Sequence, residues 1–183
     1  MSERSDNARP YNVLVLCTGN SARSVMGEAL FNVLGKGRFV AYSAGSRPSG
    51  AIQPMAADLA AELGYDTTQL RSKSWDEFER PDAPQMDIVI TVCDNAAGEA
   101  CPVWLGSPMT AHWGVDDPAA AVGDESARRH AYMKAFTELR RRVDLLLALP
   151  VEKLERLVIE RHLRDIGTSQ SAYDRANESA SDA

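Results

Sequence analysis

The most informative stretch of this chain reads Cys17-Thr18-Gly19-Asn20-Ser21-Ala22-Arg23-Ser24. A short apolar run with β-branched residues, 11–17, precedes it and predicts a buried strand. After it, apolar residues recur at helical spacing as far as two glycines: Val25, Met26, Ala29, Leu30, Val33 and Leu34. The stretch is therefore predicted to be a loop that joins the end of a strand to the start of a helix.

Such a loop suits the binding of a tetrahedral oxyanion. Wrapped at a helix N-terminus, it points successive backbone N–H groups at one centre. Arg23 adds two parallel donors and a permanent positive charge. The same field favours the thiolate of Cys17, to which Ser24 can donate a hydrogen bond. Gly19 and Asn20 tolerate the backbone angles of a tight loop. The predicted oxyanion-binding residues, around a nucleophile at Cys17, are Thr18, Gly19, Asn20, Ser21, Ala22, Arg23 and Ser24.

A Cys-x5-Arg pattern also arises by chance, in which case Cys17 is a buried strand residue and Arg23 a surface side chain. The position of the pattern between strand and helix, with Gly-Asn inside and Ser after the arginine, favours a functional loop. A nucleotide-binding P-loop is excluded, because the chain has no Gly-Lys-Ser/Thr sequence.

Strands and helices alternate along the rest of the chain. Further strands are predicted at 38–43, 87–93 and 109–112, and further helices at 54–64, 126–149 and from 151 to about 165. In the last helix we expect Leu154, Leu157 and Val158 to face inward. The alternation predicts a three-layer α/β fold, in which a four-stranded, mainly parallel sheet is flanked by helices. Ligands of such sheets bind beyond the carboxyl ends of the strands, where Cys17 and Cys93 are predicted to lie.

Length and composition predict one catalytic domain at 10–166, with disordered tails at 1–9 and 167–183. The net charge of −6 argues against nucleic acid or an anionic membrane as a partner. No signal peptide or membrane-spanning run is visible, so we expect a cytoplasmic protein. An odd number of cysteines, three, does not suggest a structural disulfide framework.

Two segments together resemble a known family. They are the loop at 17–24 and His112-Trp113-Gly114-Val115-Asp116-Asp117-Pro118-Ala119, and they resemble the arsenate reductases related to low-molecular-weight protein tyrosine phosphatases. The resemblance covers residues 11–149 and implies that phosphatase fold, here with an extra C-terminal helix. It also implies that Asp117, immediately before proline, is the general acid that protonates the leaving oxygen. Asp116 is the competing candidate, and without the upstream loop the pair would be a plain acidic turn.

The segment from Cys93 to Pro102 matches the redox segment of these reductases. The resemblance implies that Cys17 attacks arsenic, that Cys93 then attacks Cys17 and releases arsenite, and that Cys101 attacks Cys93. No bound cofactor is expected. Thioredoxin is the expected electron donor, with glutaredoxin or a small thiol as alternatives, because the gap between Cys93 and Cys101 is one residue longer than in thioredoxin-coupled members. A core cysteine at 93 and a free loop cysteine at 101 are the simpler interpretations, and a zinc site lacks close ligand pairs.

Some members of the family bind potassium through an Asn, a Glu, a Ser and an Asp. Asn20, Glu28 and Ser43 match the first three, whereas the fourth position falls at Lys73. A lysine ammonium there would take the place of the cation, so no metal is predicted; alternatively Lys73 is a solvated loop residue. His112, His130 and His162 show no metal-ligand spacing.

The favoured function is arsenate reduction for arsenic detoxification, by a thiol-dependent oxidoreductase that could retain some phosphatase activity. The first alternative is a low-molecular-weight protein tyrosine phosphatase that uses Cys17, Arg23 and Asp117 alone. The small side chains of the alanines at 119–121 offer little contact surface to a phosphotyrosine ring, which disfavours the phosphatase alternative. The second alternative is an oxyanion or redox sensor without turnover.

Overall fold

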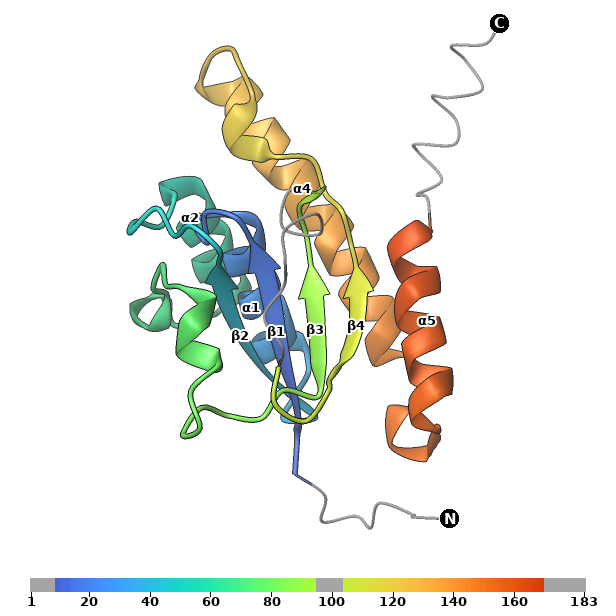
Figure 1. The fold of residues 1–183 in the computed structure, drawn as a ribbon. Coiled ribbons are helices and arrows are strands. Elements are labelled where there is room, and N and C mark those ends of the chain that lie inside the picture. The colour runs from blue at the N-terminus through green and yellow to red at the C-terminus, as the bar shows by residue number, and fades with distance from the viewer. Residues whose placement is uncertain (1–8, 95–103, 170–183) are drawn as a thin grey trace, which may run out of the picture.

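The strands of the sheet all run in the same direction, as the computed structural model shows for a chain described at residues 9–94 and 104–169 (Figure 1). Strands β1 (Tyr11–Cys17), β2 (Phe39–Gly45), β3 (Ile88–Thr91) and β4 (Met109–His112) lie in the order β2-β1-β3-β4, and every neighbouring pair is parallel. The carboxyl ends of all four strands therefore meet at one edge of the sheet. The predicted α/β fold with a parallel sheet is confirmed.

The helices follow the predicted order. The longer ones are α1 (Arg23–Leu34), α2 (Pro54–Leu63), α4 (Glu125–Leu147) and α5 (Arg156–Thr168). Short 3-10 helices lie between them: η1 (Thr67–Gln69), η2 (Trp75–Phe78), η3 (Pro118–Ala120) and η4 (Val151–Lys153). Figure 1 shows α1 and α4 on one face of the sheet and α5 alongside β4.

Strand β1 is buried on both faces, which explains its unbroken apolar sequence. Val13, Val15 and Cys17 join the larger core cluster, which α1, α4 and α5 complete. Leu14 and Leu16 point to the opposite face, where Phe78, Met86 and Trp104 cover them. The loop that follows Cys17 thus begins at the end of the central, fully enclosed strand, which gives it a rigid base.

Helix α5 corrects one prediction. Leu157 is 75% exposed and Val158 is 39% exposed, so neither faces inward. The buried side chains of α5 are Ile159, Leu163 and Ile166, at the spacing of one helical face. The reason is that η4 occupies 151–153 and α5 begins only at Arg156, which sets a different face toward the core. Leu154 packs against the core as predicted, and α5 runs on to Thr168, past the expected end of the domain at 166.

Within residues 9–94 and 104–169, no helix has the length and apolar character needed to cross a membrane. The predicted tails lie almost wholly outside these ranges, and so does Cys101.

Candidate active site

The loop at 18–22 holds its carbonyl oxygens away from its centre. It leaves β1 at Cys17 and enters α1 at Arg23, and Ala22 caps the helix without a side-chain hydrogen bond. A segment that follows β2 donates backbone N–H groups to three of its carbonyls, each at 2.9 Å: Arg47 to Thr18, Ser49 to Gly19, and Gln53 to Ser21. The Ser72 hydroxyl also donates to the Gly19 carbonyl, at 3.2 Å.

This arrangement turns N–H groups inward. In a trans peptide the C=O and the next N–H point in opposite directions. Since the carbonyls of Thr18, Gly19 and Ser21 point outward, the N–H groups of Gly19, Asn20 and Ala22 point into the loop. The Asn20 N–H does so, since it donates to Cys17 Sγ at 3.1 Å. The loop is thus a cup of donors that matches a tetrahedral oxyanion.

Cys17 lies at the base of this cup, and the residue is 4% exposed. Ser24 Oγ lies 2.9 Å from it, as predicted. Asn20 Nδ2 donates to the same hydroxyl at 2.9 Å, so the proton of Ser24 is free to point at the sulfur. One backbone N–H and one hydroxyl are therefore placed to donate to the sulfur of Cys17.

Gly19 and Asn20 were both expected to adopt the unusual backbone angles of a tight loop, but only Asn20 does so. Asn20 has a φ of 45°, in the left-handed region that asparagine tolerates. Gly19 is not in that region, and a methyl group at its position would meet only Ser21 Oγ, at 3.6 Å. The glycine that the loop needs is Gly45, at the end of β2, where a side chain would collide with the Thr18 carbonyl. Gly45 was missed by sequence reasoning, although a glycine that ends a strand is a signal of close backbone approach.

The predicted acid lies against the predicted arginine. Arg23 Nη2 is 3.4 Å from Asp117 Oδ2, and Arg23 Nη1 donates to the Val115 carbonyl at 3.0 Å. Asp117 also begins η3, where its carboxylate accepts from the Ala119 N–H at 3.1 Å. Burial, and then the charge of Asp117, raise the pKa of Tyr132 on α4. This geometry favours Asp117 over Asp116, because it is the carboxylate of Asp117 that contacts Arg23.

The second predicted thiol also reaches the loop. Cys93 follows β3 and is buried, and its Sγ lies 3.5 Å from the hydroxyl of Thr18. Cys101 lies outside the described residues, so the structure brings together four of the five residues predicted to be catalytic: Cys17, Arg23, Asp117 and Cys93.

A buried polar cluster supports the loop from behind. Lys73 is 8% exposed, so it is not a solvated loop residue. Its backbone N–H donates to Asn20 Oδ1 at 2.8 Å, and its Nζ donates to the Arg71 carbonyl at 3.1 Å. Burial lowers the pKa of Lys73, whereas the charge of Glu28 acts to raise it. Lys73 is therefore a neighbour of both Asn20 and Glu28, two of the positions that were compared with cation ligands.

Glu28 is the anionic member of this cluster. Ser43 Oγ donates to one of its oxygens, and Tyr65 OH donates to the other at 3.1 Å. Burial raises the pKa of Glu28, and the Ser43 hydrogen bond and the Lys73 charge oppose that rise. Burial and the nearby carboxylate raise the pKa of Tyr65 to about 12. In the described part of the chain, no group of three or more His, Cys, Asp or Glu side chains is placed to hold a metal ion.

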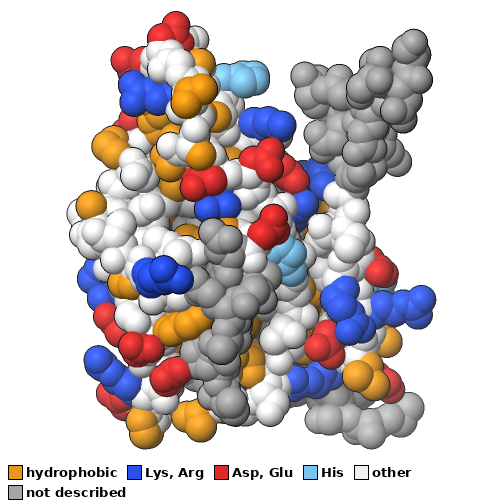
Figure 2. Space-filling model, turned by 45° about the horizontal axis from the view of Figure 1, so that its top comes forward, with side chains coloured by type: hydrophobic (Ala, Val, Ile, Leu, Met, Phe, Trp, Pro, Cys, Tyr) orange, Lys and Arg blue, Asp and Glu red, His pale blue; other side chains and the backbone are white. Residues whose placement is uncertain are grey.

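His112 connects the two segments that carry the acid and the second thiol. Its Nδ1 lies 2.8 Å from Thr91 Oγ1, and its Nε2 lies 2.9 Å from Asp94 Oδ1. Asp94 immediately follows Cys93. At this end of the molecule Figure 2 shows basic and acidic side chains interspersed, without a broad field of one sign.

These contacts place a buried cysteine, an arginine and a loop of inward-pointing N–H donors in an arrangement that suits a tetrahedral oxyanion. The chain matches the low molecular weight phosphotyrosine protein phosphatase family over residues 12–162, and it belongs to that family.

Several arsenate reductases are similar to this chain. The enzyme of Halalkalibacterium halodurans is 31% identical over 131 residues, which are 72% of this chain and 91% of the relative. That of Staphylococcus aureus is 35% identical over 127 residues, 69% of this chain and 92% of the relative. The crystal structure of arsenate reductase from Archaeoglobus fulgidus is similar with a TM-score of 0.54 and 30% identity, covering 72% of this chain and 98% of that one.

Proposed function

We propose that this chain reduces arsenate to arsenite by a relay of three thiols. The proposal rests on the position of Cys93. The sulfur of this second buried cysteine lies 3.5 Å from the hydroxyl of Thr18, which belongs to the loop that follows Cys17. A phosphatase needs only Cys17, Arg23 and an acid. A reductase of this kind needs a second thiol as well, and Cys93 contacts Thr18, the residue next to Cys17.

In the first step the Cys17 thiolate attacks arsenic in the donor cup. One hydroxyl group of arsenate leaves, and Asp117 donates a proton to it so that it departs as water. Arg23 and the loop N–H groups stabilise the negative charge of the remaining oxygens. The product is a thiol–arsenate adduct on Cys17, with arsenic still in its oxidised state.

In the second step the Cys93 thiolate attacks Cys17 Sγ. A sulfur–sulfur bond forms, the sulfur–arsenic bond breaks, and its electron pair stays on arsenic, which leaves as arsenite. Cys101 then attacks Cys93, which frees Cys17 and moves the disulfide to the Cys93–Cys101 pair. A thioredoxin-like protein, a glutaredoxin or a small thiol reduces that disulfide. We place the reaction in the cytoplasm, where such reductants are maintained.

A coupled assay tests this proposal. Purified protein is mixed with arsenate, thioredoxin, thioredoxin reductase and NADPH, and NADPH loss is followed for the wild type, Cys17→Ser, Cys93→Ser and Cys101→Ser. We expect arsenate-dependent loss in the wild type and none in the three variants. If no thiol donor supports NADPH loss, and phosphatase turnover is fast and survives Cys93→Ser, the chain is a phosphatase and the proposal fails.

A further inference from the structure

We propose that α5 is a positioning element for the acid loop, defined here as residues 113–117. The proposal rests on the role given above to Asp117. Helix α5 lies along the edge strand β4 (Figure 1), with its start bound through Arg156 to the Ser107 carbonyl and its end beside His112. It thus spans β4 from the loop before the strand to the residue from which the acid loop departs.

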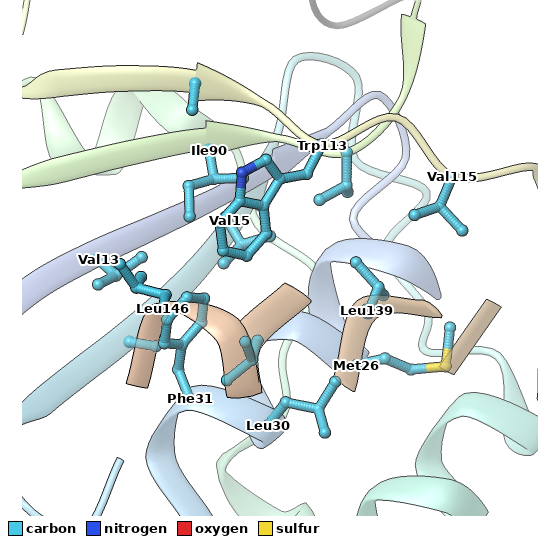
Figure 3. Close-up of a cluster of buried hydrophobic side chains, with 14 of the residues drawn as sticks. Val13, Val15, Met26, Leu30, Phe31, Ile90, Trp113, Val115, Leu139 and Leu146 are labelled. Atoms are coloured by element: carbon cyan, nitrogen blue, oxygen red, sulfur yellow. The ribbon is translucent and has the colours of Figure 1, made fainter. Parts of the chain in front are cut away.

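The first contact that carries the proposal is made by Trp113, the first residue of the acid loop. Trp113 is 1% exposed, and its Nε1 donates to the Leu163 carbonyl of α5 at 2.9 Å. In Figure 3 the indole lies among Val15, Ile90 and Phe31, and its ring stacks on that of Phe31 with centroids 6.1 Å apart. Packing fixes the plane of the ring, and the hydrogen bond to α5 fixes its rotation within that plane.

The second contact is the close approach of Gly167, in the last turn of α5. A methyl group at this position would lie far inside van der Waals distance of the His112 carbonyl and 2.9 Å from Trp113 Cδ1. The two obstacles are the backbone of an edge strand and a ring enclosed by the core, so neither can yield easily. Glycine therefore lets the helix lie directly on the junction between β4 and the acid loop.

The position of Trp113 is transmitted to Asp117 through a short and well-held loop. The Trp113 N–H donates to the Thr91 carbonyl at 2.7 Å, and the Val115 N–H donates to the Val92 carbonyl at 3.0 Å. Arg142 Nη1 donates to the Gly114 carbonyl at 2.8 Å. Asp117 follows two residues after Val115. Because this segment is short and hydrogen-bonded along its length, a displacement of Trp113 moves the carboxylate of Asp117 relative to Cys17.

The effect on chemistry follows from the demands of proton transfer. A general acid acts only within hydrogen-bond reach of the leaving oxygen, about 2.6–3.2 Å. A displacement on the order of 1 Å lowers a rate by up to about 100-fold. Helix α5 therefore matters for the first step of the proposed reaction, through contacts that it makes with Trp113 and His112.

The test is a double-mutant cycle between Gly167→Ala and Asp117→Asn, with kcat/KM for arsenate as the readout. Gly167→Ala adds a single methyl group at this contact, and we expect kcat/KM for arsenate to fall about tenfold. If α5 acts through the acid, the same change in the Asp117→Asn background costs less than about twofold, because no acid is left to misplace. The matched control is Leu157→Gln on the exposed side of α5, for which we expect wild-type kcat/KM.

A purely structural role for α5 predicts a different result. In that case the two losses multiply, or Gly167→Ala leaves kcat/KM unchanged, and either outcome overturns the inference. If Gly167→Ala does not fold, as judged by its thermal midpoint, Trp113→Phe takes its place, since it removes the indole donor and keeps an aromatic ring. Asp117→Asn alone tests the proposed acid: if it turns over like the wild type, that role fails together with this inference, while the thiol relay is judged separately by Cys93→Ser.

Discussion

The guanidinium of Arg23 lies 3.4 Å from the carboxylate of Asp117 and at the same time donates to the Val115 carbonyl. These contacts join two segments far apart in sequence, the oxyanion loop and the acid loop. The same side chain that is predicted to bind the oxyanion thus also holds the acid beside it. Replacing the guanidinium of Arg23, with its several N–H donors, should therefore weaken oxyanion binding and slow proton transfer from Asp117.

Arg23→Lys is expected to lower kcat/KM for arsenate by about 100-fold or more. Lysine keeps the charge but is a point donor, so it cannot contact an oxyanion and the acid loop together. The comparison is Arg129→Lys, a change in a surface pair with Glu62 that should leave kcat/KM unchanged. Near-normal kinetics for Arg23→Lys would show that charge alone suffices.

Asp117→Asn should reduce kcat/KM by about 100-fold to 10,000-fold, because the leaving oxygen loses its proton donor. Asp116→Asn is a matched control one residue away and should stay within about twofold of the wild type. Steady-state kinetics with arsenate decide between the two. The reverse pattern would make Asp116 the acid.

Thr18→Val should slow arsenate reduction and leave phosphatase turnover nearly unchanged. The hydroxyl of Thr18 lies 3.5 Å from Cys93 Sγ, and valine keeps its shape without the polar group. The expected loss in reduction is about five- to tenfold, from one hydrogen bond to a reacting thiol. Thr18→Ser should restore the rate. Equal losses in both activities would mean that the hydroxyl serves the loop itself and not Cys93.

Lys73→Met should destabilise the protein more at pH 8 than at pH 4.5. Burial raises the folded-state pKa of Glu28 above its ordinary 4.5, so folding loses stability as the pH rises through that folded value and Glu28 ionises. The Lys73 charge opposes this loss, and its removal enlarges it by about 1 kcal/mol or more at pH 8.

Urea unfolding at the two pH values measures this difference. In the Lys73→Met, Glu28→Gln double variant the extra loss at pH 8 should vanish. A loss that is the same at both pH values would show that Lys73 acts through packing alone.

Side-chain chemistry and periodicity were enough to predict the loop and the order of the elements. Cys17, Arg23 and Ser24 have the residue types that their contacts require, and β1 reads as a buried strand because both of its faces are enclosed. The predictions failed where backbone geometry decides. Leu157 and Val158 look like a buried stripe, but the start of α5 at Arg156 turns them outward.

The main-chain hydrogen bonds that hold the loop at 18–22 could not be predicted from the sequence either. Arg47, Ser49 and Gln53 bind the loop through main-chain N–H groups, which every residue except proline carries. No residue type marks such a contact. The contact between Gly167 and His112 likewise joins residues 55 positions apart in the numbering. It depends on how α5 packs against β4, and a single glycine does not reveal that.

The relay is tested most directly by a single turnover of Cys101→Ser with arsenate and no external reductant. This variant keeps Cys17 and Cys93 but cannot pass the disulfide on. We predict one arsenite released per chain and a Cys17–Cys93 disulfide detected by mass spectrometry after alkylation, with neither product from Cys93→Ser. Arsenite released equally fast by Cys93→Ser, or none released by Cys101→Ser, would contradict the relay.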